Sequence, residues 1–227
     1  MKTHRKISLT AGILYLLTFV SIPSLAYFYV PVKKAGYLLG SGSDTHTIIG
    51  GFLEVIVALT GIATAVVLFS VLKKQNETAA LGLVAARILE SATIFVGVAC
   101  LLTVATLHKE GVGAASLPVS HALVSLYERL FLIAQSFMPA ICDLLLGFLL
   151  YKSRLVPRGL SMIGIIGGPV LLVGYFASLF GVVEQHAPLA GLSAIFVAVF
   201  EFSLGVWLIV KGFNPQAIAS LESKKSE

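Results

Sequence analysis

Six apolar stretches follow one another along the chain, separated by short polar connections. They cover residues 8–29, 47–72, 79–107, 122–151, 159–180 and 189–210. Each approaches or exceeds the ~20 residues that a helix needs to cross the ~30 Å hydrocarbon layer of a membrane. None shows the alternation of apolar and polar residues found in membrane β-strands. The pattern predicts an all-α, polytopic membrane protein: a six-transmembrane-helix bundle forming one domain over residues 1–227, with a short polar tail at about residues 214–227.

The basic residues between these stretches are distributed unequally. With the N-terminus inside the cell, eleven lysines and arginines fall on the cytoplasmic side: Lys2, Arg5, Lys6, Lys73, Lys74, Lys152, Arg154, Arg158, Lys211, Lys224 and Lys225. The opposite side holds three: Lys33, Lys34 and Lys109. Because cytoplasmic loops are enriched in basic residues, we expect both termini to be cytoplasmic.

The first stretch has a second interpretation as a cleaved signal peptide. A basic segment precedes it, and Ser24-Leu25-Ala26 resembles a cleavage site. The apolar run continues past that site to Val30, which favours a retained span. Both interpretations leave the other five spans in the same orientation.

Composition supports a membrane location. Hydrophobic residues make up 57% of the chain and charged residues 12%, whereas soluble domains carry about 25% charged residues. The net charge of +5 arises in loops and tails, which is not the pattern of a nucleic-acid-binding face. We therefore expect the lipid bilayer as the surroundings, no nucleic-acid partner and no cofactor; the oligomeric state stays open. Cys100 and Cys142 lie inside predicted spans, as free thiols.

Seven ionisable side chains interrupt the apolar stretches, and their charges are not balanced. Five are acids and two are arginines: Glu54, Arg87, Glu90, Glu128, Arg129, Asp143 and Glu201. A charge at bilayer depth costs about 2.5–3.5 kcal/mol on insertion scales, so such residues mark a pairing network or a pathway. Two arginines can neutralise two carboxylates. The remaining three must be protonated, hydrated or paired with a cation.

The fourth stretch carries the most extensive polar face. One set of its side chains recurs every seven residues and therefore shares a face of the helix: His121, Glu128, Gln135 and Cys142. A second set lies about 100° further round: Arg129, Ser136 and Asp143. Pro139 is expected to kink this helix. The predicted polar intramembrane core is Glu54, Arg87, Glu90, Glu128, Arg129, Gln135, Asp143 and Glu201.

Depth along the helices suggests how these charges pair. Counting ~1.5 Å per residue from the ends of the stretches gives two sets of partners. They are Arg87 with Asp143 or Glu201, and Arg129 with Glu54 or Glu90.

Two functional hypotheses of different class follow. In the first, the protein is a small carrier or channel-like protein whose polar core handles protons or a small polar solute. In the second, it is a non-catalytic scaffold or accessory protein, and the buried charges only fix the register of the helices. No Gly-x-Ser-x-Gly turn and no phosphate-binding glycine loop is present. No catalytic residue is therefore assigned, and enzymatic activity stays undecided with the balance against it.

The histidines raise a further alternative. His46, His108, His121 and His186 all map to the outer ends of predicted spans, where imidazoles and nearby acids can bind a metal ion. The chain lacks the His-x3-His and Glu-x-x-His spacings of helical metal sites. We therefore assign no metal site. A metal-dependent intramembrane hydrolase is kept only as a remote alternative.

Three segments resemble a known family. They are AGILYLL at residues 11–17, LYKSRLVPRGLSMIGIIGG at residues 150–168 and FEFSLGVWLIVKGF at residues 200–213. The chain resembles a family of uncharacterised bacterial six-span integral membrane proteins, known only as a domain of unknown function. The resemblance implies six helices, a multi-pass location in the cytoplasmic (inner) membrane of a bacterium and no established activity. It supplies no catalytic residues.

Overall fold

The computed structural model describes residues 2–34, 36–40 and 43–223. Six helical segments in these ranges are long and apolar enough to cross a membrane. They are Thr3–Phe28, Thr45–Leu72, Glu77–Lys109, Gly113–Ser153, Arg158–Leu179 and Pro188–Val210. Each matches one predicted stretch, although the fourth begins at Gly113 rather than at residue 122. The all-α, six-span fold is therefore confirmed, and the chain is a multi-pass membrane protein.

Three of the six spans are single regular helices and three are interrupted. The regular ones are α3 (Thr45–Leu72), α4 (Glu77–Lys109) and α7 (Arg158–Leu179). The first span consists of α1 (Lys2–Thr18), α2 (Ser21–Pro23) and the π-helical turn η1 (Ser24–Phe28). The fourth consists of η3 (Gly113–Ser116), α5 (Leu117–Leu132), the π-helical turn η4 (Ile133–Phe137) and α6 (Met138–Ser153). The sixth consists of α8 (Pro188–Ser193) and α9 (Ile195–Val210).

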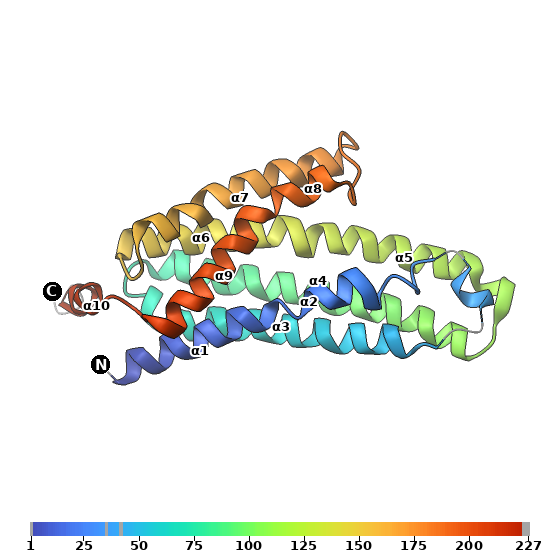
Figure 1. The fold of residues 1–227 in the computed structure, drawn as a ribbon, viewed down its shortest axis with the longest axis horizontal. Coiled ribbons are helices and arrows are strands. Elements are labelled where there is room, and N and C mark those ends of the chain that lie inside the picture. Colours follow the sequence, from blue (N-terminus) through green and yellow to red (C-terminus); the bar gives the residue numbers. More distant parts are fainter. Residues whose placement is uncertain (1, 35, 41–42, 224–227) are drawn as a thin grey trace.

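Both ends of the chain lie at the same end of the bundle, here called the terminal end (Figure 1). The opposite end, the distal end, carries the connection between α4 and α5 and the short helix η2 (Tyr37–Leu39). Most of the predicted polar tail forms α10 (Pro215–Ser223), and its Ala217 and Leu221 pack into the hydrophobic core. Residues 224–227 of that tail lie outside the described residues.

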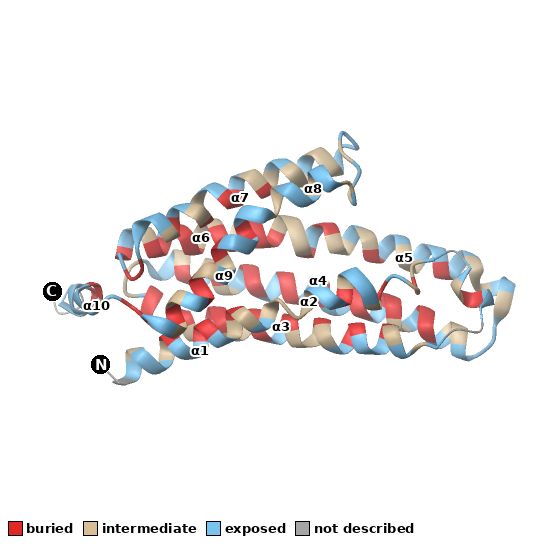
Figure 2. Cartoon of the chain, in the orientation of Figure 1, coloured by how far each residue is buried: buried red, intermediate tan, exposed pale blue. Residues whose placement is uncertain are grey.

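The terminal half of the bundle is a closed ring of six helices. Around this ring α1 packs on α3, α3 on α4, α4 on α6, α6 on α7, α7 on α9 and α9 on α1. Close approach of α1 and α9 requires glycine, because a Cβ on Gly12 would lie 2.7 Å from the Gly205 carbonyl oxygen. Buried leucines such as Leu68, Leu146 and Leu204 fill the core. Figure 2 shows buried residues lining the inner faces of the helices.

The distal half is narrower. There α3, α4 and α5 continue with η1 packed against α3, while α7 and α8 diverge from α5 and end short of the distal tip (Figure 1). The 33 residues of α4 form a helix of about 50 Å, longer than the ~30 Å hydrocarbon layer. The 22 residues of α7 give about 33 Å. We infer that the α7–α8 connection marks the distal boundary of the membrane.

The predicted distortion at Pro139 takes the form of a π-helical turn. Pro139 lies in the first turn of α6, directly after η4. Because proline has no backbone N–H, it cannot continue the regular ladder of hydrogen bonds. A π-helical turn inserts an extra residue into the helix, and such turns occur frequently at functional sites.

Candidate functional site

A buried cluster of charges occupies the centre of the six-helix ring. Arg87 of α4 donates from Nη1 to both carboxylate oxygens of Glu90, at 3.0 Å each. Its Nη2 donates to Glu201 Oε1 of α9 at 2.5 Å and lies 3.9 Å from Asp143 Oδ1 of α6. The guanidinium carbon also lies 5.9 Å from the centre of the Tyr15 ring of α1. We call Arg87, Glu90, Asp143 and Glu201 the Arg87 cluster.

The sequence positions this cluster in two ways. Arg87 and Glu90 are three residues apart on one helix, so their side chains share a face. Glu201 precedes Gly205 by one turn, and the α1–α9 contact at that glycine brings Glu201 and Tyr15 toward the ring centre. The predicted partners of Arg87, Asp143 and Glu201, are thus both found beside its guanidinium.

The Arg87 cluster contains three carboxyl groups and one guanidinium. Glu90 and Glu201 accept hydrogen bonds from Arg87. Asp143 is fully buried, yet neither of its carboxyl oxygens has a hydrogen-bond partner within the described residues. The Cys142 thiol lies 3.5 Å from Glu90 Oε2. Because both Asp143 and Glu201 approach the same guanidinium nitrogen, their carboxyl groups compete for one positive charge.

Glu54 lies apart from the Arg87 cluster, in the distal half of the bundle. It lines a cavity of about 10 Å³ together with Tyr29, Thr93, Tyr127 and Gln135. That volume is close to what one water molecule requires. Glu54 is 4% exposed and Tyr29 is fully buried. Glu54 Oε1 and the Tyr29 hydroxyl both lack a hydrogen-bond partner in the part of the chain that the structure describes.

The hydroxyl of Tyr29 remains a neutral donor beside this carboxyl group. Burial raises the pKa of Tyr29, and the nearby Glu54 carboxylate raises it further. The Tyr29 ring packs edge-on against Tyr127, with ring centres 5.7 Å apart. Sequence reasoning missed Tyr29, because an aromatic residue at the end of an apolar run is usually an interfacial anchor. Tyr27, which is 60% exposed, fits that description better.

Glu128 and Arg129 do not join the Arg87 cluster and instead contact the connection between α7 and α8. Glu128 Oε1 is 3.2 Å from Lys33 Nζ, and Glu128 Oε2 is 2.8 Å from His186 Nε2. Arg129 is exposed, and it donates to Gln185 Oε1 at 3.2 Å. We call Lys33, Glu128, Arg129, Gln185 and His186 the distal cluster.

The predicted pairing of Arg129 with Glu54 or Glu90 is therefore wrong. Arg129 bonds to Gln185, and Glu90 is bound by Arg87. The physical reason is that depth matching compares helices only, whereas Gln185 lies in the connection between α7 and α8 and Lys33 lies in the loop after the first span. The true partners of Glu128 and Arg129 come from the loops at residues 29–44 and 180–187, whose conformation helical periodicity does not predict.

Gln135 lies between two cavities. It lines the small Glu54 cavity and also a cleft of about 290 Å³ between α5–η4 and the α7–α8 hairpin. The side chain of Gln135 makes no hydrogen bond with any described residue. Of the eight predicted core residues, the structure thus brings four together at Arg87, pairs Glu54 with Gln135 in one cavity, and leaves Glu128 and Arg129 at the membrane boundary.

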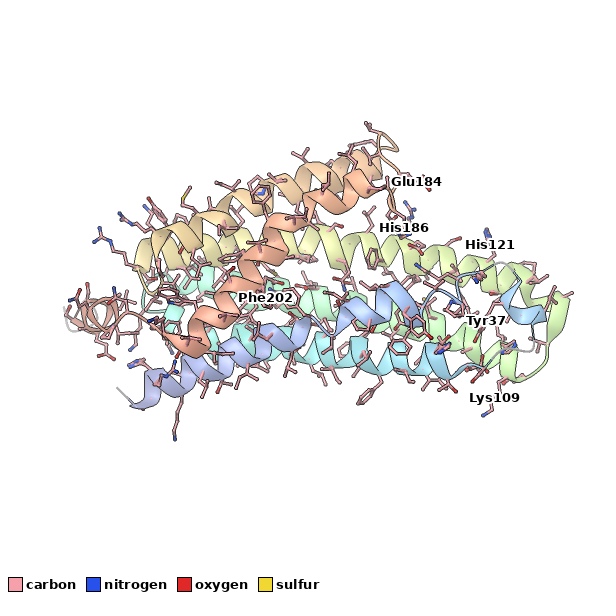
Figure 3. All side chains as sticks on the ribbon, viewed as in Figure 1. Tyr37, Lys109, His121, Glu184, His186 and Phe202 are labelled. Atoms are coloured by element: carbon pink, nitrogen blue, oxygen red, sulfur yellow. The ribbon has the colours of Figure 1, made fainter. Side chains whose placement is uncertain are left out.

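The four histidines named as metal candidates are held in separate environments. His108 contacts Asp44 Oδ1 and the Gly40 carbonyl oxygen, at 2.8 Å and 2.9 Å. His46 packs against Tyr27, with ring centres 5.2 Å apart. Figure 3 shows His121 on α5 and His186 on the α7–α8 connection. Among the described residues, no three His, Cys, Asp or Glu side chains are grouped as metal ligands.

Asp44 links Tyr37 to His108 at the distal end of the bundle. Its carboxylate accepts a hydrogen bond from the Tyr37 hydroxyl and contacts His108. Burial and the hydrogen bond to Asp44 raise the pKa of Tyr37 to about 12. Tyr37 is therefore a neutral donor, and these contacts anchor the distal loop to α4.

Comparison with known families identifies the chain at the level of the domain. A family model described as "Domain of unknown function (DUF4386)" matches residues 10–212. No curated protein and no solved structure matches the chain. The chain belongs to the DUF4386 family of domains of unknown function, which agrees with the resemblance found in the three sequence segments.

Proposed function

We propose that this protein is a small carrier-type membrane protein whose buried carboxyl groups bind and release protons. The observation that supports it most strongly is the unequal charge of the Arg87 cluster, where three carboxyl groups share one guanidinium. A buried charge without a partner is costly, and a carboxyl group avoids that cost by taking up a proton. Among the described residues, both carboxyl oxygens of Asp143 and Oε1 of Glu54 are buried without a hydrogen-bond partner.

The two carboxyl sites have complementary surroundings. Asp143 lies beside Arg87, where a change in the position of Glu201 would alter the charge that Asp143 experiences. Glu54 lies against a cavity the size of one water molecule, beside the neutral hydroxyl of Tyr29. A water molecule in this cavity would have both the Glu54 carboxyl group and the Tyr29 hydroxyl as hydrogen-bond partners, and it would allow Glu54 to exchange its proton. Glu54 is the group closer to the distal end, and Asp143 is the group in the core.

A scaffold role is the second candidate, and one observation favours it. The Arg87 cluster joins α4, α6 and α9, with Tyr15 of α1 packed on the guanidinium. Such a network fixes the register of four helices even if no proton is exchanged. The remote alternative of a metal-dependent hydrolase gains no support from the described residues, where no group of metal ligands is assembled.

The location and orientation complete the proposal. The excess of basic residues at the terminal end favours a cytoplasmic position for both termini. The distal cluster would then face the opposite side of a bacterial cytoplasmic membrane. Protons would move between Glu54 and the Arg87 cluster across the middle of the bundle.

The proposal is tested by infrared difference spectroscopy of the protein in lipid vesicles, recorded while the pH of the medium is changed. We expect a carbonyl stretching band from protonated, buried carboxyl groups whose intensity depends on pH. Asp143→Asn and Glu54→Gln should each remove part of that band. Glu128→Gln is the matched control, because Glu128 is already paired at the membrane boundary, and it should leave the buried component unchanged.

A second measurement relates protonation to transport. Vesicles that contain a pH-sensitive dye should show proton movement under an imposed membrane potential, and Glu54→Gln should slow it. If no carboxyl band responds to pH and the wild-type protein moves no protons, the proton proposal fails and the scaffold role is favoured.

A further inference from the structure

The cleft between α5–η4 and the α7–α8 hairpin has a polar lining that the lipid-facing surface does not require. Its volume is about 290 Å³, near the lower limit for small-molecule sites. Six hydroxyl, amide or imidazole side chains line it: Gln135, Ser136, Ser178, Gln185, Ser193 and His186. Lipid tails offer none of these groups a hydrogen bond, so a polar cleft at this depth is stable only if it holds water or a polar molecule.

The backbone on both walls of the cleft is irregular. One wall contains the π-helical turn η4, and the other contains Ala194, where α8 ends and α9 begins. Near this break the Ser193 hydroxyl donates to the Ala190 carbonyl oxygen at 2.6 Å. Interrupted helices expose backbone groups, and in membrane proteins they are tolerated where they are buried in protein or border a water-filled cavity. Paired interruptions of this kind commonly mark the binding sites of transporters.

Several polar groups in the cleft have no hydrogen-bond partner among the residues that the structure describes. The side chains of Gln135, Ser136 and Ser178 make no hydrogen bond with any other described residue. His186 is the one side chain lining the cleft that can carry charge, and it is held by Glu128. The available groups are therefore neutral donors and acceptors, which suit an uncharged, hydrogen-bonding molecule better than an ion.

We propose that this cleft is a water-accessible binding site for small, uncharged polar molecules, located directly beside the Glu54 cavity. Gln135 and Phe131 line both spaces, so the cleft and the Glu54 cavity share part of their walls. This inference rests on the proposed function: it names the kind of solute that would bind when Glu54 takes up a proton. Gln185 and His186 also line the cleft. Gln185 Nε2 donates to the Glu128 backbone carbonyl oxygen at 3.0 Å, and His186 Nε2 lies 2.8 Å from Glu128 Oε2.

Cysteine labelling in lipid vesicles tests the proposal. The reagent is 2-hydroxyethyl methanethiosulfonate, which is itself small, uncharged and hydroxylated. Ser136→Cys and Ala194→Cys place thiols on the two walls of the cleft. Ile195→Cys is the control, because Ile195 is adjacent to Ala194 but is exposed on the lipid-facing side. The parent chain is the blank, since its Cys100 and Cys142 are both buried.

We expect both cleft variants to react at least about tenfold faster than Ile195→Cys, because the reactive thiolate forms only where water is present. Labelling is followed by the mass of the intact protein. Adding Gln185→Ala to either cleft variant should accelerate the labelling further, because this change removes a side-chain amide that lines the cleft and bonds to Glu128.

Rates for both cleft variants no greater than that of Ile195→Cys would overturn the proposal. Because the two cysteines lie on different walls of the cleft, the test remains valid if one of the two variants folds poorly. Labelling does not require that Glu54 or Asp143 exchange protons. A positive labelling result, together with a silent infrared titration and no proton movement, would therefore refute the proton proposal and leave the binding cleft supported. A negative labelling result with a carboxyl band that responds to pH would refute the cleft and leave the proton proposal supported.

Discussion

Arg87 and Arg129 lie on the neighbouring helices α4 and α5, in apolar runs of similar character, yet their surroundings differ in every respect. Arg87 is 4% exposed and is bound by Glu90 and Glu201, with Asp143 close by. Arg129 is exposed and bonds to a neutral amide, that of Gln185. Arg87 therefore depends on carboxylates inside the protein, whereas Arg129 lies at the surface of the bundle.

The difference shows that an apolar helix can be much longer than the hydrocarbon layer that it crosses. The fourth span covers 41 residues, about twice what the hydrocarbon layer requires. Its terminal half, α6, contributes Asp143 to the core, and its distal half, α5, carries Glu128 and Arg129 to the boundary. The two clusters thus make different contacts. The Arg87 cluster connects α4, α6 and α9 through buried charged groups. The distal cluster connects α5 to the α7–α8 connection.

The largest effect is expected for Arg87→Met. Removal of the guanidinium leaves three buried carboxyl groups without a positive partner, and breaking a buried ion pair in this way costs about 3–5 kcal/mol. We expect a large loss of thermal stability, measured by the unfolding of the purified protein in detergent. A variant as stable as the parent would show that the carboxyl groups are already neutral and that Arg87 is not needed to balance them.

A smaller loss is expected for Glu201→Gln. The amide preserves the shape of the side chain but replaces the charge-assisted bond from Arg87 Nη2 with a neutral one. Hydrogen bonds to charged groups contribute about 1.5–3 kcal/mol, and Glu90 still binds Arg87 in the variant. The thermal stability should therefore lie between those of the parent and Arg87→Met. A loss as large as that of Arg87→Met would mean that Glu201 is the sole effective partner.

Asp143→Asn tests the carboxyl group of the Arg87 cluster that accepts no hydrogen bond from Arg87. Because Asp143 has no hydrogen bond with a described residue, we expect it to be protonated, and a neutral amide of nearly the same shape then changes the stability by less than about 1 kcal/mol. An ionised Asp143 predicts instead a loss comparable to that of Glu201→Gln. Unfolding measurements on the two variants side by side decide between these cases.

The spans and two of the three acidic neighbours of Arg87 could be predicted. Glu90 was assigned to Arg129 but binds Arg87, and the environment of Arg129 could not be predicted. Spans follow from the length of apolar runs, and Asp143 and Glu201 were matched to Arg87 because all three lie in regular helices whose rise per residue is fixed. Gln185, Lys33 and Tyr29 lie in connections or just beyond an irregular turn, where no period applies. The position of Glu128 depends on how far α5 extends past the membrane, which is determined by its packing on α4.

The smallest effect is expected for Arg129→Met, the same substitution as at Arg87 in the other region. Exposed polar contacts contribute little, so the stability should change by no more than about 0.5 kcal/mol. The side chain does orient Gln185, whose amide also bonds to Glu128. Thiol labelling of the adjoining cleft should therefore accelerate slightly even though unfolding is unaffected. If Arg129→Met instead lost as much stability as Arg87→Met, Arg129 would be a buried structural charge, and the membrane boundary could not lie at the α7–α8 connection.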